Sequence, residues 1–133
     1  MKNQVINDER AEEIFQEFLD EFELDRLDDS KEAFNKKILK AIKLGRLDFD
    51  LENFKATFTL KKKIGDKTQV VLSLDNVTTG KAQDVSKVIE KDGNYNSLIE
   101  LISCGSFANH EILQAKPTDV GTLAGLSLYF LAS

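Results

Sequence analysis

The chain has one cysteine, one proline, one histidine and no tryptophan. With Cys104 alone, no disulfide can form within the chain, which is typical of a reducing compartment. No stretch approaches the roughly 20 consecutive apolar residues of a membrane-spanning helix. The first residues turn acidic without an apolar run, so we expect no signal peptide. These absences favour a soluble cytoplasmic protein that is held together by its hydrophobic core.

The 133 residues are 41% hydrophobic and 31% charged, which is enough to bury a core within a single domain. Charge is distributed unevenly along the chain. Residues 1–30 hold 11 acids and 3 bases, residues 31–63 hold 4 acids and 10 bases, and residues 64–133 hold 8 acids and 5 bases. The acidic and basic blocks should attract each other, either within the fold or between copies.

The N-terminal third predicts two amphipathic helices. In the first, Asn7 or Asp8 is the expected cap, and apolar residues recur at steps of three and four. In the second, Asp29 and Glu32 have the spacing of a capping box, and Gly45 is the expected stop. We therefore expect a helical hairpin within residues 1–46.

Residues 54–74 alternate between apolar and polar side chains with a period of two, on either side of Gly65-Asp66. This pattern predicts a β-hairpin with its turn near residues 63–67, whereas the acidic residues Asp48, Asp50 and Glu52 are read as a polar approach to the strand. Three helical stretches follow, and the last begins after Pro117. The predicted fold is a single α+β domain, with a helical hairpin (1–46), a β-hairpin (47–75) and a C-terminal three-helix unit (76–133).

The pair Gly80-Lys81 raises the question of a phosphate loop. A Walker loop needs a glycine where this chain has Asp75, and a serine or threonine where it has Ala82. The segment is better explained as a strand-to-helix corner. We expect Thr78 or Thr79 to cap the helix and Gly80 to ease the turn.

Other chemistries find little support. The carboxylates of the first helix have the spacing of a solvated face, and Asp48, Asp50 and Glu52 lack the glycine and distal glutamate of a calcium loop. Cys104 and His110 supply only two soft ligands, whereas a structural zinc site needs about four. We expect Cys104 to be a small buried residue, and we expect no catalysis, metal or cofactor.

Lysines of the second helix and of the hairpin turn, among them Lys61, Lys62 and Lys63, are able to hold phosphates non-specifically. Only three arginines accompany them, and eleven acids lie upstream. Lysine on an edge strand also discourages aggregation between sheets. We therefore do not expect nucleic acid as the partner, although a small adaptor that binds protein or DNA through the basic hairpin stays open as an alternative.

Residues 40–133 carry a resemblance. A strand ends in "LSL", the corner "DNVTTGKAQDV" leads into a helix, "LIELISCGS" ends the next helix, and "PTDVGTLAGLSLYFL" forms the last. This order resembles the tail assembly chaperones of long-tailed bacteriophages. Val77 and Lys81 depart from that family's pattern, which has a proline and an acid at these positions.

The resemblance implies a non-catalytic protein that binds the tape measure protein, and then gives way to the tail tube protein as the tail assembles. It also implies the cytoplasm of an infected bacterium as the location, absence from the mature virion, and a possible homo-oligomer. A holder of helical partners needs apolar grooves with charged rims. The candidate contact residues are Phe15, Phe18, Leu19, Phe22, Leu126, Leu128, Tyr129 and Phe130. The alternative reading is that both stripes form the core.

Overall fold

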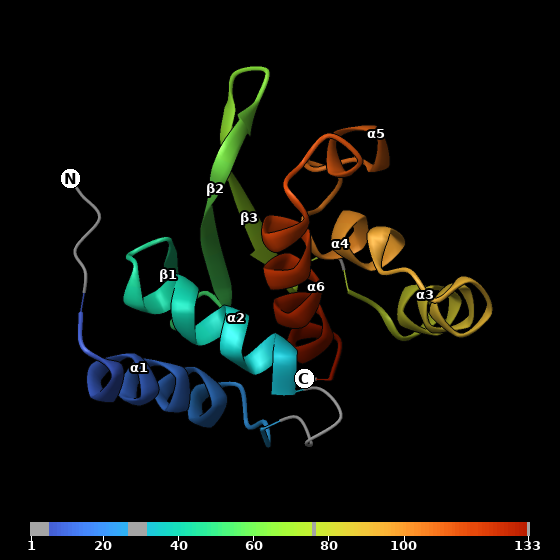
Figure 1. Ribbon diagram of the computed structural model, residues 1–133. Coiled ribbons are helices and arrows are strands. Elements are labelled where there is room, and N and C mark those ends of the chain that lie inside the picture. Colours follow the sequence, from blue (N-terminus) through green and yellow to red (C-terminus); the bar gives the residue numbers. More distant parts are fainter. Residues whose placement is uncertain (1–5, 27–31, 76, 133) are drawn as a thin grey trace.

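The computed structural model describes residues 6–26, 32–75 and 77–132. It is an α+β fold, as predicted, in which helices lie on one side of a small antiparallel sheet (Figure 1). The elements in chain order are α1 (Asp8–Glu21), α2 (Glu32–Lys43), β1 (Leu47–Asp50), β2 (Lys55–Ile64), β3 (Lys67–Ser73), α3 (Thr79–Asp92), α4 (Asn96–Ile102), α5 (Asn109–Ile112) and α6 (Pro117–Ala132).

The ends of α1 and α2 follow from local sequence. Asn7 caps α1, because its Oδ1 accepts the N–H of Arg10 at 2.8 Å. After α2, Gly45 takes a left-handed φ of 73°, and the N–H of Arg46 reaches back to the carbonyl of Ala41 at 2.9 Å. This is a Schellman ending, so the predicted stop at Gly45 is confirmed. The predicted capping residue Asp29 lies outside the described residues.

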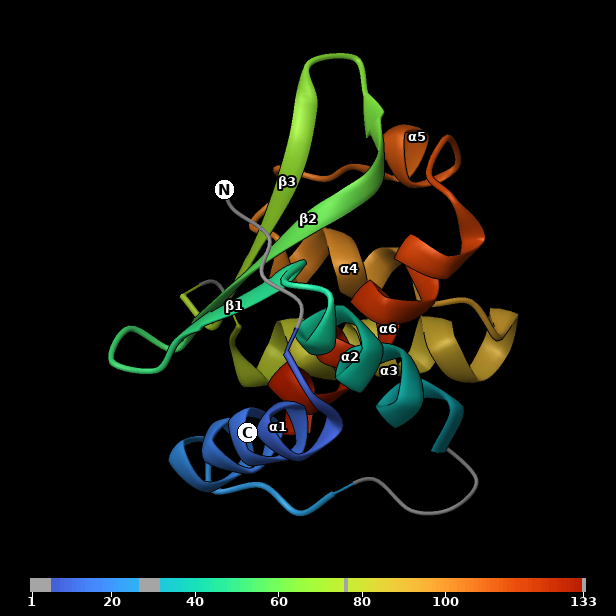
Figure 2. The ribbon, with the colours of Figure 1, turned by 60° about the vertical axis from the view of Figure 1, so that its left-hand side comes forward.

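The predicted hairpin is present, with its turn at Gly65 and Asp66, between β2 and β3. The sheet has a third strand that the sequence analysis missed, since residues 47–50 pair with β2 to give the order β1-β2-β3. Phe58 is consequently flanked by Leu47 on one side and Val70 on the other, and all three are buried. The far end of the hairpin extends beyond the helices (Figure 2).

Helix α6 lies between α2 and α4 and contacts both. It is apolar nearly all round, as a central helix must be. Its packing on α2 is close because Gly125 has no side chain: a Cβ there would lie 2.9 Å from the Cβ of Phe34. One core cluster contains residues from all three predicted segments of the chain, so the helices and the sheet share a single core.

The C-terminal unit differs from the prediction in one respect. A short helix, α5, lies between α4 and α6, so residues 77–132 of this unit form four helices instead of three. Helix α3 packs loosely, and among its described side chains none is fully buried. Figure 2 shows α5 beside the outer part of the hairpin, at the end of the molecule opposite α1.

Candidate partner-binding groove

The apolar stripes proposed as contact faces lie inside the protein. Rings from α1 and α6 pack on each other: the Phe15 and Tyr129 centroids are 5.7 Å apart, and those of Phe18 and Phe130 are 6.0 Å apart. This corrects the expectation of an exposed binding face, because each stripe buries the other. The buried candidates are Phe15, Phe18, Leu19, Phe22, Leu126, Tyr129 and Phe130, and Leu128 is half-buried.

The strand-to-helix corner is where the sequence placed it. Thr78 is the cap of α3, and its side-chain oxygen accepts the N–H of Lys81 at 3.3 Å. The role expected for Gly80 is not supported, since this residue lies inside the first turn of α3 rather than in the bend. Its φ is not left-handed, and a Cβ there would meet nothing within 4 Å. Neither conformation nor space requires glycine at this position.

Cys104 is exposed, which contradicts the expectation of a small buried residue. It follows α4 with a left-handed φ of 57°, and its N–H donates to the carbonyl of Leu101 at 3.1 Å. Cys104 therefore terminates the helix in a position that usually holds glycine. His110 is also exposed, on α5.

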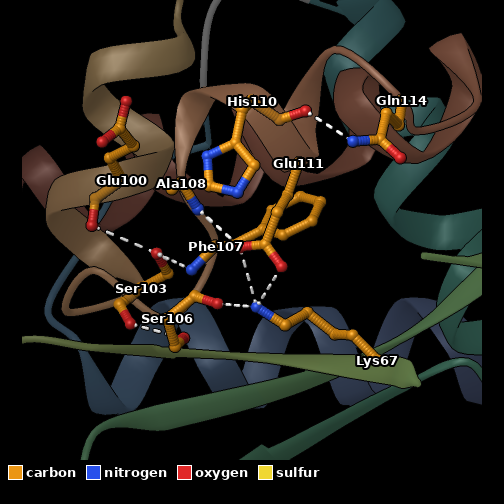
Figure 3. A network of polar contacts seen from close by, with 9 residues as sticks. All are labelled: Lys67, Glu100, Ser103, Ser106, Phe107, Ala108, His110, Glu111 and Gln114. Carbon is orange, nitrogen blue, oxygen red and sulfur yellow. Dashed lines mark hydrogen bonds and ion pairs between the residues drawn. The ribbon is translucent and has the colours of Figure 1, made fainter. Parts of the chain in front are cut away.

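A polar network joins the hairpin to the segment around α5 (Figure 3). The ammonium of Lys67 lies 2.9 Å from Oε2 of Glu111 and also donates to the carbonyl oxygen of Ser106. Glu111 accepts the N–H of Ala108 at 3.0 Å as well. These contacts, above all the hydrogen bond from Lys67, lower the pKa of Glu111. The network satisfies its own charges, so we assign it a structural role.

A larger feature is an open groove between α1 and the outer face of the sheet. Its volume is about 1000 Å³. One wall is a single face of α1 with Arg10, Ile14 and Glu17, which recur at helical spacing. The opposite wall comes from the polar, outward positions of the strands, including Thr57 on β2 and Gln69 on β3. Residues from four separate parts of the chain thus meet in one depression.

The groove combines apolar surface with charges of both signs. Its half-buried apolar side chains are Ile6, Ile14, Phe49 and Leu51, and its charged side chains are Arg10, Glu17, Arg46 and Asp48. The N–H of Ile6 donates to the carbonyl of Lys43 at 3.0 Å, which holds the edge of the groove against α2. Apolar anchors surrounded by a polar rim are the usual composition of a protein-binding surface.

The sequence analysis did not identify this groove. Ile14 is one of the apolar positions of the first predicted helix, and Thr57 is one of the polar positions in the alternating segment 54–74. No local pattern indicates that these two faces line one depression, because their spatial relation depends on how α1 packs on α2. The groove is lined by residues beside the predicted stripe of α1, and none of the predicted contact residues lines it.

In the described parts of the chain, no group of three or more His, Cys, Asp or Glu residues is placed to hold a metal ion. No helix of residues 6–26, 32–75 or 77–132 is long and apolar enough to cross a membrane. Comparisons with protein-family models, with curated proteins and with solved structures found no match for this chain.

Proposed function

We propose that this chain is a non-catalytic assembly chaperone of a long-tailed bacteriophage tail, which holds an apolar helical segment of the tape measure protein. The proposal combines two supports. The order of strand, corner and helices in residues 40–133 resembles that family, and the groove between α1 and the sheet provides a surface of the required kind. The groove is the observation that carries the proposal.

The groove suits a helical partner for a physical reason. A helix presents apolar side chains at positions i, i+3, i+4 and i+7, which together form a stripe that needs a long apolar depression. In this groove Ile6, Ile14 and Leu51 supply apolar lining for such a stripe, and polar and charged side chains lie around them. Arg46 and Asp48 in its lining carry opposite charges and form no ion pair with another described residue, which favours one orientation of a charged helix over the other.

Release of the helical partner follows from the charged side chains of the same groove. A rim of exposed charges contributes to the association rate more than to affinity, so binding stays reversible when a competitor arrives. In the proposed function the competitor is the tail tube protein, which displaces the chaperone as it polymerises around the tape measure protein. The chaperone then acts in the host cytoplasm and is left out of the finished virion.

The experiment is co-expression with the long helical protein encoded nearby, followed by size-exclusion chromatography with light scattering at two salt concentrations. A soluble stoichiometric complex, with a partner that aggregates when alone, supports the proposal and reports the copy number. If the two proteins elute separately and the partner is soluble alone, the proposal fails.

An adaptor that binds DNA is the second candidate, because Lys61, Lys62 and Lys63 are all exposed on the projecting hairpin. The two candidates differ in their response to salt. DNA binding through lysines weakens steeply with salt, since each neutralised phosphate releases counterions. Binding of an apolar helix changes much less, so titration of a duplex DNA at two salt concentrations separates the candidates.

A further inference from the structure

A second, smaller cavity lies where α2, β2 and the first turns of α6 meet. Its volume is about 110 Å³. Its lining includes four basic side chains: Lys37 and Lys40 from α2, Arg46 from the turn that follows, and Lys61 from β2. It shares only Arg46 with the groove described above.

The charges around this cavity are unbalanced. Four basic side chains face one acid, Asp119, so the lining has a net charge of +3. Among the ion pairs within the described residues, none includes these four cations. Lys43 and Lys55 from the same basic segment, by contrast, pair with Asp8 and Asp75. Like charges around one small cavity repel one another, and an anion bound between them relieves this repulsion.

The position of Lys37 is determined by packing. A Cβ at Gly121 of α6 would lie 2.8 Å from Cε and 2.9 Å from Cδ of Lys37, so the glycine makes room for the lysine stem. The same point lies 3.7 Å from the Lys37 ammonium. Gly121 is in the second turn of α6, so a positive charge is held near the positive end of a 16-residue helix. An anion between them relieves that repulsion.

Asp119 neutralises only part of this charge. It is 3% exposed, and its Oδ2 accepts the N–H of Lys61 at 2.8 Å and that of Lys62 at 3.5 Å. The carboxylate therefore serves as an acceptor for backbone N–H groups of β2, at the point where the pairing of β2 with β3 is irregular. These bonds hold the Asp119 carboxylate against β2, and three positive charges of the lining have no counter-charge among the lining residues.

We propose that this cavity binds one small oxyanion, that is, a single phosphate or carboxylate group. Lys37 and Lys40 line it from α2, Lys61 lines it from β2, and Arg46 adds charge from the turn after α2. Lysine and arginine side chains form charge-assisted hydrogen bonds with both kinds of group. A volume of about 110 Å³ is well below the roughly 300 Å³ at which sites for drug-sized molecules begin, so the cavity itself has room only for a group of this size. The group is supplied either by free phosphate or by an acidic side chain of a peptide.

The test uses the full chain and two doubly substituted variants. In the first, Lys37→Gln and Lys61→Gln remove two of the cavity's cations. In the matched control, Lys36→Gln and Lys63→Gln remove the same charge from the same two elements, α2 and β2, at exposed positions outside the cavity. Melting in chloride alone establishes that both variants fold. The probes are sodium phosphate and a hexaglutamate peptide, titrated against chloride at equal ionic strength and followed by amide NMR shifts of Lys62 and Thr118.

The two sources of the anion give different results. If phosphate binds the unaltered chain and the control, and binds the cavity variant at least about tenfold more weakly, the site takes free phosphate. If only the peptide binds, with the same loss in the cavity variant, the group is a carboxylate of a protein partner. The proposal is overturned if neither probe shifts the amides beyond chloride, or if both variants lose affinity equally.

Discussion

The phenolic hydroxyl of Tyr129 on α6 donates a hydrogen bond to Oδ1 of Asn35 on α2 over 2.5 Å. Both residues are completely buried. The amide of Asn35 continues the chain of contacts by donating to Oε2 of Glu32 at 3.1 Å, and this bond is the main reason that the pKa of Glu32 is lowered. A buried polar pair of this kind fixes the rotation of one helix against the other, because any other orientation leaves the groups without partners.

Removal of the Tyr129 hydroxyl tests the importance of that pair. We expect Tyr129→Phe to lower the free energy of unfolding by about 1–2 kcal/mol, since it withdraws a buried donor from Asn35. Tyr95→Phe is the matched control, because Tyr95 is half-buried and its hydroxyl makes no hydrogen bond within the described residues. Urea unfolding of both variants measures the difference, and equal stabilities would contradict the assigned role.

The space around two glycines predicts opposite effects for their substitution by alanine. Gly125 lies where α6 closely approaches α2, whereas Gly80 lies in α3 beside open space. Gly125→Ala places a methyl group 2.9 Å from the Cβ of Phe34, and we expect it to cost about 1–3 kcal/mol of stability. Gly80→Ala adds a methyl group to open space in the first turn of α3, so we expect a gain of up to about 1 kcal/mol. Thermal unfolding distinguishes the two, and a Gly125→Ala variant as stable as the parent would show that the helices are not tightly packed there.

The contact between Lys67 and Glu111 predicts a pH dependence. The pKa of Glu111 in the folded chain is lowered from the ordinary value of 4.5, chiefly by the hydrogen bond from Lys67. A carboxyl group with a lowered pKa stabilises the fold above its unfolded-state pKa, and this contribution is lost as the pH falls through the folded-state value. We therefore expect Glu111→Gln to be less stable than the parent at pH 7, with the difference shrinking below about pH 4.5.

Unfolding from pH 7 to pH 3 measures that difference. Glu90→Gln is the control, since Glu90 is an exposed residue of α3 that forms no ion pair with another described residue. A stability difference for Glu111→Gln that stays constant across this range would contradict a role for its charge.

Much of the fold was predictable because its signals are local. The cap at Asn7, the stop at Gly45 and the hairpin turn at Gly65 each depend on a few neighbouring residues. Strand β1 was missed because four residues, two of them aspartates, form a strand only when β2 offers an edge for pairing. The exposure of Cys104 depends on its left-handed conformation after α4, which no pattern of apolar residues indicates.

The surfaces were less predictable than the elements. The stripe with Phe15 and Phe18 and the stripe with Tyr129 and Phe130 are recognisable from spacing alone, yet spacing does not show that they cover each other. Likewise, Lys37 and Lys61 are 24 positions apart in the basic block, and only the packing of α6 brings them to one cavity. Pairwise contacts between distant segments decide which faces remain open for partners.

The most direct test of the central claim is partner solubility when the groove is altered. Ile14→Asp places a charge at the apolar position of the wall contributed by α1, and Gln69→Trp fills the groove from the sheet side at an exposed position. Leu113→Asp, at a side chain that is 71% exposed and outside the groove, is the control. Melting of each purified variant shows whether it folds.

The measurement is the fraction of the helical tape measure protein that stays soluble when it is co-expressed with each variant. We expect the parent chain and Leu113→Asp to keep the partner soluble, and Ile14→Asp and Gln69→Trp to lose most of this effect while remaining folded. If the folded groove variants hold the partner as well as the parent does, the groove is not the binding surface.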